Sequence, residues 1–395
     1  MNEKLMKIDK LLEQSNIDII LVNSPENIFY LTGLTPNQLT VSRNPNFAGL
    51  IFNREDQKLI LSTMDYENAT FESQSKNIDL RPYTTWVGLK TEEELRTGKE
   101  SVYDFRTSVD VLTDSIKELY PEGKFTLGLE LEFITSLYLE QIKTKLPNAE
   151  IKNISQLFIK SRAIKTEEEI EAFRNITKVQ DEALTEMTKH IKVGISEKEL
   201  VEIYRQGIYK DGRYLPSGWI MLGFGENSSR LSRPTDRRLK ISDAIRFDGG
   251  SNADFEFYTT DFSRSWLMPE ADDILKRTKK ILYNAQRKMI KSIKPGMKFS
   301  ELFNLGMEEV KKDIPNYTRG HLGHSISLGP QTAEYPVINK DNHDTIEKNM
   351  ILCVEVPLYT TGLSGFNIED MILVTEDGCE VLTHRTPHIL EFENL

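Results

Sequence analysis

The stretch 351-ILCVEVPLYTTGLSGFNIEDMILV-374 decides the fold that we predict for the second half of this 395-residue chain. Two apolar runs, 351–356 and 370–374, read as core strands, and the turn-rich segment between them is centred on Gly362. A hairpin folded about this glycine places Glu355 opposite Glu369, with the two Cβ atoms about 5 Å apart. Carboxylates that close repel each other strongly unless cations lie between them. The hairpin therefore predicts a cation site.

A second acidic pair, Asp248 and Asp261, flanks the turn-rich segment 249–254 in the same way. Asp248 ends an apolar run, and Asp261 lies within the strand-like stretch 255–266. The midpoint of the pair is slightly off the centre of the turn, so we expect a bulge or a longer loop there. A buried carboxylate is costly without a cationic partner, which makes both residues candidates to hold a cation.

The candidate imidazole is His324, which stands next to Gly323 in the glycine-containing segment 320–326. Glycine lets the backbone approach a metal site closely. Carboxylate oxygens suit hard divalent ions, and one imidazole shifts the preference towards Mn²⁺, Fe²⁺, Co²⁺ or Zn²⁺. A lone Asp or His is more often a surface or simply hydrogen-bonded residue. Two carboxylate hairpins together with this histidine predict a metal centre.

Bulk composition is that of a globular protein, with 38% hydrophobic and 28% charged residues. The formal net charge is −11, whereas a nucleic-acid binder needs a basic surface, so we predict no nucleic-acid partner. One basic cluster is interpreted first as a solvated loop face and second as a rim that attracts an anionic substrate. It consists of Arg230, Arg233, Arg237, Arg238 and Lys240.

Cysteine content and hydropathy predict the location. Cys353 and Cys379 are too few for a disulfide framework, which favours a reducing compartment. Residues 1–18 lack the apolar core of a signal peptide, and no apolar stretch approaches the ~20 residues that cross a bilayer. We therefore predict a soluble, cytoplasmic protein with no membrane partner.

Element patterns divide the chain into two domains. Strand-like and helix-like segments alternate in residues 1–155, which indicates an α/β domain. In residues 156–395 strands and helices are grouped, which favours α+β. A capping box at Thr166 predicts a long helix from about residue 165 to 192. Further strands are expected at 17–22, 47–52, 59–62 and 125–129, and further helices at 102–119, 134–146, 196–210, 271–293 and 300–313.

The sequence resembles the pita-bread metallopeptidase family, which holds Xaa-Pro dipeptidase, aminopeptidase P, methionine aminopeptidase and creatinase. The matching stretches occur in the family's order over nearly the whole chain. In the second half they are Phe247-Asp248-Gly249-Gly250, Thr260-Asp261-Phe262-Ser263-Arg264, Gly323-His324-Ser325-Ile326, Val354-Glu355-Val356-Pro357 and Ile368-Glu369-Asp370 with Thr375-Glu376-Asp377-Gly378. In the first half they are residues 23–33, NSPENIFYLTG, and the join at 162–170, RAIKTEEEI.

The resemblance implies a creatinase-type N-terminal domain, 1–155, followed by a pita-bread catalytic domain, 156–395. It also implies two divalent metal ions, with Mn²⁺ preferred over Fe, Co or Zn, that serve hydrolysis of a C–N amide bond. Asp261 and Glu369 would bridge the ions, and Glu355 would bind one ion and act as the base. The implied ligands are Asp248, Asp261, His324, Glu355 and Glu369. Xaa-Pro dipeptides are the expected substrates, and the implied assembly is a homodimer in which the N-terminal domain helps to close the partner's pocket.

Three departures from the family pattern affect the substrate prediction. The segment 225–236 lacks the usual histidine, and the usual His-Glu-x-Pro motif corresponds to Ala333-Glu334-Tyr335-Pro336, or to Gln331 without a gap. Asn367 stands where an arginine is common. Losing one donor to a reacting carbonyl costs roughly 10²–10³-fold in rate. His321 is a candidate stand-in, and Glu334 and Tyr258 are weaker pocket candidates; all three also have a purely structural reading.

The alternative is a relative that acts on another small molecule, as creatinase, ectoine hydrolase and a sulfonium-compound lyase do. The missing histidines favour this alternative, whereas the complete ligand set argues against a metal-free mechanism. A third possibility is a non-catalytic, partner-binding module. Such modules usually lose metal ligands, and all five are present here, which disfavours this class.

Overall fold

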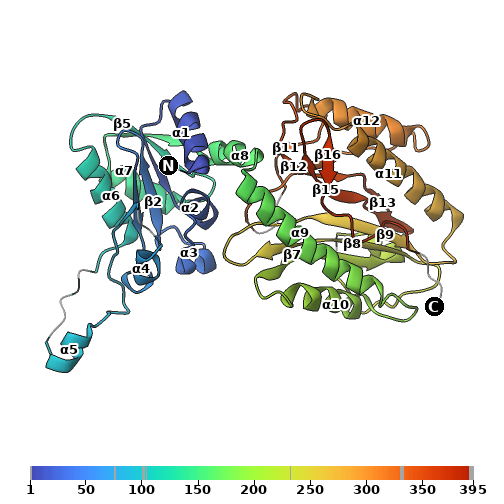
Figure 1. The fold of residues 1–395 in the computed structure, drawn as a ribbon, viewed down its shortest axis with the longest axis horizontal. Coiled ribbons are helices and arrows are strands. Elements are labelled where there is room, and N and C mark those ends of the chain that lie inside the picture. Colours follow the sequence, from blue (N-terminus) through green and yellow to red (C-terminus); the bar gives the residue numbers. More distant parts are fainter. Residues whose placement is uncertain are drawn as a thin grey trace. The chain divides into compact units, whose positions relative to one another are not determined.

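The computed structural model describes residues 2–74, 77–99, 103, 105–231, 233–329 and 333–390. The chain forms two compact units, Met1–Ser161 and Arg162–Leu395 (Figure 1). The boundary expected at residue 155 lies at the first residue of helix α8 (Ser155–Ala163), and the division between the units falls inside this helix.

The first unit contains a six-stranded mixed sheet in the order β4-β3-β2-β1-β5-β6. Strands β1, β5 and β6 are parallel, as are β3 and β4, whereas β2 runs antiparallel to both of its neighbours. The alternation of strands and helices confirms the α/β prediction. The strands are β1 (Ile19–Val22), β2 (Gly49–Asn53), β3 (Lys58–Ser62), β4 (Ile78–Leu80), β5 (Phe125–Leu129) and β6 (Ala149–Asn153).

Helices α6 and α7 pack on this sheet and form the core of the first unit. Leu112 and Ile116 of α6 contact Leu21 and Ile51 in a fully buried apolar cluster. Helix α6 begins at Ser108 behind a capping box, later than expected, and Val102 lies outside the described residues. The helices are α1 (Glu3–Gln14), α2 (Pro25–Thr32), α3 (Asn37–Ser42), α4 (Asp65–Glu72), α5 (Glu92–Thr97), α6 (Ser108–Leu119), α7 (Ser136–Lys145) and α8.

The motif at residues 23–27 is explained by a buried carboxylate at the start of α2. Glu130, 3% exposed, accepts hydrogen bonds from the backbone N–H groups of Asn23 and Ser24 at 2.7 and 2.9 Å. It also accepts from Ser24 Oγ at 2.6 Å and from Asn27 Nδ2 at 2.5 Å. Burial raises the pKa of Glu130, and these four donors oppose that rise. The carboxylate thus pairs the backbone N–H groups of the two residues that precede α2, near the positive end of the helix dipole.

The second unit has a three-stranded sheet that is covered by two helices (Figure 1). Helix α9 (Glu167–Thr188) packs on β8 and helix α10 (Glu197–Tyr209) packs on β7. Helix α9 begins at the predicted capping box of Thr166. The antiparallel strands are β7 (Tyr214–Phe224), β8 (Ala244–Ala253) and β9 (Phe262–Leu267), and a short 3₁₀ helix, η1 (Gly225–Ser229), follows β7.

A five-stranded antiparallel sheet, in the order β11-β10-β12-β15-β16, completes the second unit. Helices α11 (Asp273–Ser292) and α12 (Phe299–Lys311) bury Leu282 and Phe303 against Leu352 and Ile372 of this sheet. This grouping confirms the α+β prediction. The strands are β10 (Gly323–Ser325), β11 (Glu334–Val337), β12 (Ile351–Glu355), β15 (Glu369–Val374) and β16 (Cys379–Val381).

The hairpin predicted between residues 351 and 374 is confirmed. Glu355 of β12 pairs directly with Glu369 of β15. The ladder continues in the same register through β13 (Leu358–Thr360) and β14 (Ser364–Phe366). Gly362 closes the turn with φ 77°, in the left-handed region that glycine adopts without strain.

The structure corrects the pairing expected for the other acidic pair. Asp248 of β8 pairs with Ser263 of β9, so Asp261, the residue just before β9, lies two residues from Ser263 and diagonal to Asp248 on the same face. Gly250 makes this register possible, because a Cβ atom at that position would lie 1.9 Å from the carbonyl oxygen of Thr260. The β8–β9 ladder is regular, and the irregularity in register lies between β7 and β8 instead.

Candidate metal centre

Five predicted ligand side chains meet in one cavity of about 660 Å³ in the second unit. Each is between 2% and 7% exposed. They come from β8, from the residue before β9, from β10, from the end of β12 and from the start of β15. They are Asp248, Asp261, His324, Glu355 and Glu369.

The spacing of the ligand atoms forms two overlapping groups. One carboxylate oxygen from each of Asp248, Asp261 and Glu369 lies within 4.8 Å of the other two, and atoms of His324, Cys353 and Glu369 meet the same condition. His324 Nε2 lies 3.7 Å from Asp261 Oδ2 and 4.0 Å from Glu369 Oε1, which links the groups. Glu369 belongs to both groups.

Cys353 was not predicted as part of this site. It is fully buried, and its Sγ donates a weak hydrogen bond to the carbonyl oxygen of Asp261 at 3.3 Å. It comes near His324 because β10 and β12 pair these two residues. The pairing joins strands that are far apart in the sequence, and no local pattern indicates it.

Burial and the repulsion between like charges disfavour the ionised form of two of the carboxylates. Burial raises the pKa of Glu369 well above its ordinary value, and the neighbouring charges of Asp261, Glu355 and Asp248 raise it further. The pKa of Asp248 is also raised, chiefly by burial. Divalent cations would remove this repulsion. The donor set of four carboxylates and one imidazole fits Mn²⁺, Fe²⁺, Co²⁺ or Zn²⁺.

His324 presents the nitrogen that a metal ion needs. Its Nδ1 donates to the carbonyl oxygen of Ser325 at 3.0 Å, which leaves Nε2 without a proton and facing the carboxylates. Burial lowers the pKa of His324, which favours the neutral ligand form.

Glu355 has a different environment from the other carboxylates. Burial raises its pKa, yet nearby His321, His324 and Arg319 together hold the pKa below its ordinary value. His321 Nδ1 lies 3.1 Å from Glu355 Oε1. His321 also lines the cavity, as its prediction as a stand-in requires. Glu355 thus stays ionised more readily than Asp248 and Glu369, whose pKa values are raised.

Asn367 contacts three of the four ligand carboxylates. Its Nδ2 lies 2.9 Å from Ser263 Oγ and 3.1, 3.3 and 3.5 Å from oxygens of Glu355, Glu369 and Asp248. The residue is 2% exposed. Where the family often has a cationic arginine, this chain therefore offers its carboxylates a neutral amide donor.

The weaker pocket candidates lie elsewhere. Glu334 is buried and forms an ion pair with Arg162 at 2.5 Å, which favours a structural role. Tyr258 is buried with its ring edge-to-face against Phe173, 5.4 Å between centroids. Gln331 lies outside the described residues.

Other cavity-lining residues were missed at the sequence level. Arg319 and Tyr359 line it beside Glu355, and an apolar wall is built from Trp219, Met221 and Leu231. Arg319 lies in a loop, where the sequence pattern predicts that an arginine is a surface residue.

The predicted basic cluster forms local ion pairs, which favours its interpretation as a solvated loop face. The pairs are Arg230 with Glu226, Arg237 with Asp243 and Arg238 with Glu199.

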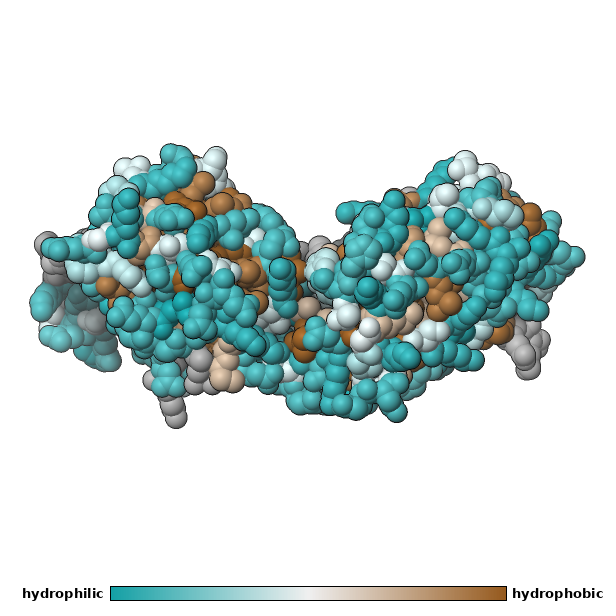
Figure 2. All heavy atoms as spheres, turned by 90° about the horizontal axis from the view of Figure 1, so that it is seen from above, coloured by the Kyte–Doolittle hydropathy of each residue, from teal (hydrophilic) through white to brown (hydrophobic). Residues whose placement is uncertain are grey.

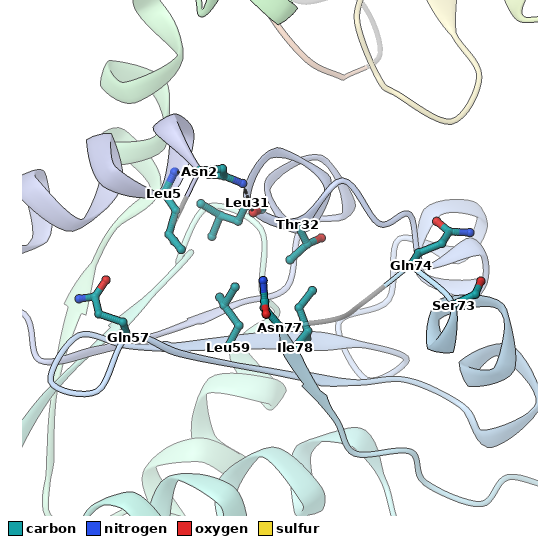
Figure 3. Close-up of a pocket in the computed structure, with 10 residues that line it drawn as sticks. All are labelled: Asn2, Leu5, Leu31, Thr32, Gln57, Leu59, Ser73, Gln74, Asn77 and Ile78. Carbon is teal, nitrogen blue, oxygen red and sulfur yellow. Dashed lines mark hydrogen bonds between the residues drawn. The ribbon is translucent and has the colours of Figure 1, made fainter.

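A second cavity, of about 440 Å³, lies in the first unit (Figure 3). The residues drawn there carry amide, hydroxyl or aliphatic side chains, such as Asn2, Gln57 and Asn77 beside Leu5 and Leu31. Such groups neither bind divalent ions strongly nor exchange protons near neutral pH. This cavity of the first unit therefore lacks side chains suited to metal binding or to proton transfer.

The pita-bread arrangement and this donor set define a metal-dependent hydrolase. The chain belongs to metallopeptidase family M24, whose model matches residues 171–376. The model of the creatinase/prolidase N-terminal domain matches residues 4–164. Both domain types predicted from the resemblance are thereby confirmed.

Relatives and solved structures agree over nearly the full length. The chain is 24% identical to an Xaa-Pro dipeptidase of Pyrococcus furiosus over 99% of this chain and 100% of the relative. It is 27% identical to an uncharacterized peptidase of Staphylococcus aureus over 96% and 99%. An Xaa-Pro dipeptidase from Bacillus anthracis has a similar fold, with a TM-score of 0.82, 23% identity and coverage of 98% and 99%. The prolidase from Pyrococcus furiosus superimposes with a TM-score of 0.77, 22% identity and coverage of 96% and 100%.

Within the described residues, no helix is long and apolar enough to cross a membrane.

Proposed function

We propose that this metallohydrolase holds two divalent ions, Mn²⁺ in preference to Fe, Co or Zn, and cleaves the C–N amide bond of Xaa-Pro dipeptides. The observation that carries the proposal is the pair of ligand groups that share Glu369 within one buried cavity. The full-length similarity to an Xaa-Pro dipeptidase supports the substrate class.

The protein's own residues have distinct roles in this proposal. Bound ions would polarise a carbonyl and lower the pKa of water. Asp248, Asp261, His324, Glu355 and Glu369 would hold them. Glu355 would accept the proton of the attacking water, and its pKa, held below the ordinary value by His321, His324 and Arg319, is consistent with an ionised carboxylate. His321 would take over part of the work of the missing histidines, and its 3.1 Å distance from the same carboxylate supports this role.

A second candidate is hydrolysis or lysis of another small molecule by the same centre. The observation that favours it is Asn367, a neutral amide within 3.5 Å of three ligand carboxylates, where an arginine is common in the family. A non-catalytic binding module is disfavoured, because the complete ligand set is buried in one cavity.

The proposal extends to assembly and location. We expect a homodimer in the cytoplasm, with small molecules or dipeptides as the binding partners. Both cysteines are free thiols, which suits a reducing compartment. Light scattering of the purified protein tests the dimer, and a monomer at micromolar concentration would contradict it.

The function is tested by hydrolysis of a panel of Xaa-Pro dipeptides with Mn²⁺-reconstituted protein, with Asp261→Ala as the control. We expect turnover that the variant loses, because Asp261 contributes a carboxylate to one ligand group and lies 3.7 Å from His324 of the other. Full activity in the variant would refute the assigned metal centre. No turnover despite bound metal would shift the assignment to the second candidate.

A further inference from the structure

The two ligand groups of the centre differ in their donor atoms. Asp248, Asp261 and Glu369 form an oxygen group, which offers carboxylate oxygens alone. His324, Cys353 and Glu369 form a mixed group, which offers a nitrogen, a sulfur and an oxygen. Oxygen ligands suit hard ions such as Mn²⁺, whereas thiolate and imidazole suit Zn²⁺. The thiol of Cys353 is thus the donor that gives the two groups different preferences.

Strand pairing places Cys353 on the ligand-bearing face of β12. It pairs directly with His324 of β10, so the two side chains leave the sheet on the same side. Glu355 follows two residues later on β12 and shares this face. Leu352 and Val354 point the other way, into the apolar core that α11 and α12 cover. The sulfur therefore faces the metal ligands and not the apolar core.

The spacing of the donors fits one tetrahedral ion. Two donors that are each about 2.0–2.3 Å from a zinc ion lie roughly 3.3–3.8 Å apart. In the mixed group, the three donor atoms lie within 4.8 Å of one another. Asp261 Oδ2 is available as a fourth donor, 3.7 Å from His324 Nε2. The donors therefore stand within about 1 Å of the spacing that a zinc ion requires.

The position of Cys353 suits an ion better than a substrate. The side chain is fully buried and is not among the described residues that line the open cavity. Its one printed hydrogen bond, to the carbonyl oxygen of Asp261 at 3.3 Å, is weak and therefore cheap to give up. Ligation replaces the S–H bond by a sulfur–metal bond and releases the proton to solvent, with no change of oxidation state.

Cys379 shows what an ordinary cysteine looks like in this chain. It is partly buried, and its Sγ contacts the carbonyl oxygen of Ile290 at 3.4 Å. It belongs to neither of the two ligand groups found among the described residues. Buried free cysteines commonly act as small apolar side chains, and this reading suits Cys379. Cys353 differs from it by the imidazole and the carboxylate beside its sulfur.

We infer that Cys353 is a sixth ligand of the centre and that the mixed group selects Zn²⁺ while the oxygen group selects Mn²⁺. This assignment rests on the two-ion centre of the proposed function and deepens it. When Mn²⁺ is the only ion supplied, both groups take Mn²⁺. When both ions are supplied, the centre binds one of each.

The test equilibrates the purified protein with equal excesses of Mn²⁺ and Zn²⁺, removes unbound ions and counts the bound metals by elemental analysis. We expect about one Zn²⁺ and about one Mn²⁺ in each chain. X-ray absorption at the zinc edge should show a sulfur neighbour at about 2.3 Å. Protein loaded with Co²⁺ should show a sulfur-to-cobalt charge-transfer band in its absorption spectrum.

Cys353→Ser should lose the sulfur neighbour and the charge-transfer band. Its dissociation constant for Zn²⁺ should rise by at least about 10- to 100-fold, because even residues that only surround metal ligands change metal affinity by that much. The affinity for Mn²⁺ should be nearly unchanged. Cys379→Ser removes the other thiol of the chain and should behave as wild type in all of these measurements.

A zinc-loaded wild-type protein without a sulfur neighbour would overturn the assignment, and this result does not depend on how well a variant folds. A sulfur neighbour that persists in Cys353→Ser, or two ions of one kind bound from the mixture, would overturn it too. These measurements use no peptide. A sulfur neighbour without Xaa-Pro turnover would leave Cys353 as a ligand and refute the substrate, whereas turnover without a sulfur neighbour would do the reverse.

Discussion

At the scale of single residues, Asn367 makes an unusual set of contacts, because one amide nitrogen lies within 3.5 Å of three ligand carboxylates. Its role should depend on whether metal is bound. Without metal, the amide is a donor that offsets carboxylate repulsion. With metal, the ions do so. Asn367→Ala should therefore lower the free energy of unfolding by about 1–3 kcal/mol in the metal-free protein and by less in the loaded protein.

Denaturant unfolding with and without Mn²⁺ measures this difference. Asn367→Asp is the companion variant, since it adds a fifth carboxylate and should destabilise the metal-free protein further. Equal losses in both states would show that Asn367 acts through packing alone.

Lys165 provides a residue-scale prediction about pH. Burial lowers its pKa from 10.5 to about 8, helped by Arg162 and opposed by Glu334, Glu169 and Cys353. Between these two pKa values the unfolded chain binds a proton that the folded chain has released, so the contribution of Lys165 to stability rises with pH. Below about pH 8 its unfavourable contribution is constant. Lys165→Met should remove this slope.

The measurement is the difference in unfolding free energy between wild type and Lys165→Met from about pH 7 to pH 10. The advantage of the variant should shrink as the pH rises through this window. A difference that does not change with pH would mean that Lys165 keeps an ordinary pKa in the folded protein.

At the scale of elements, the β8–β9 hairpin depends on close contact between two backbones. A Cβ atom at Gly250 would lie 1.9 Å from the carbonyl oxygen of Thr260, the residue before Asp261. Gly250→Ala should therefore cost about 1–3 kcal/mol and weaken Mn²⁺ binding, because the strands must separate and Asp261 must move. Thermal unfolding and metal titration calorimetry measure both effects. Gly218→Ala on β7 is the control, since nothing lies within 4 Å of its Cβ position. Unchanged metal affinity in Gly250→Ala would refute this link.

At the scale of the whole molecule, each unit has its own core, and hydrophilic side chains cover most of the face seen in Figure 2. The buried carboxylate of Glu130 belongs to the first unit alone. Glu130→Gln should destabilise that unit by about 1–3 kcal/mol, because the amide nitrogen faces donors instead of accepting from them. The Mn²⁺ stoichiometry of the second unit should not change. Hydrogen exchange resolved along the sequence, combined with metal analysis, distinguishes the units, and loss of metal in this variant would contradict their independence.

Local spacing predicted a large part of this molecule. Glu355 and Glu369 were placed opposite each other because side chains alternate along a strand and Gly362 marks the turn, so the register follows from counting residues. The same counting was wrong by two residues for the partner of Asp248, which is Ser263 and not Asp261, because the turn is centred later than its glycines suggest. The capping box at Thr166 likewise located the start of α9 from local hydrogen-bonding chemistry.

The sequence by itself determined the two domains, the family resemblance and the five candidate ligands, because each of these is written in local motifs and in their order. Only the tertiary structure decided which other groups reach the carboxylates. Cys353 meets His324 through the pairing of distant strands, and Asn367 and Arg319 approach Glu355 from separate segments. Glu334 forms an ion pair with Arg162 and does not line the cavity of the ligand set. Such approaches depend on how whole elements pack, and packing is a long-range property that no local spacing encodes.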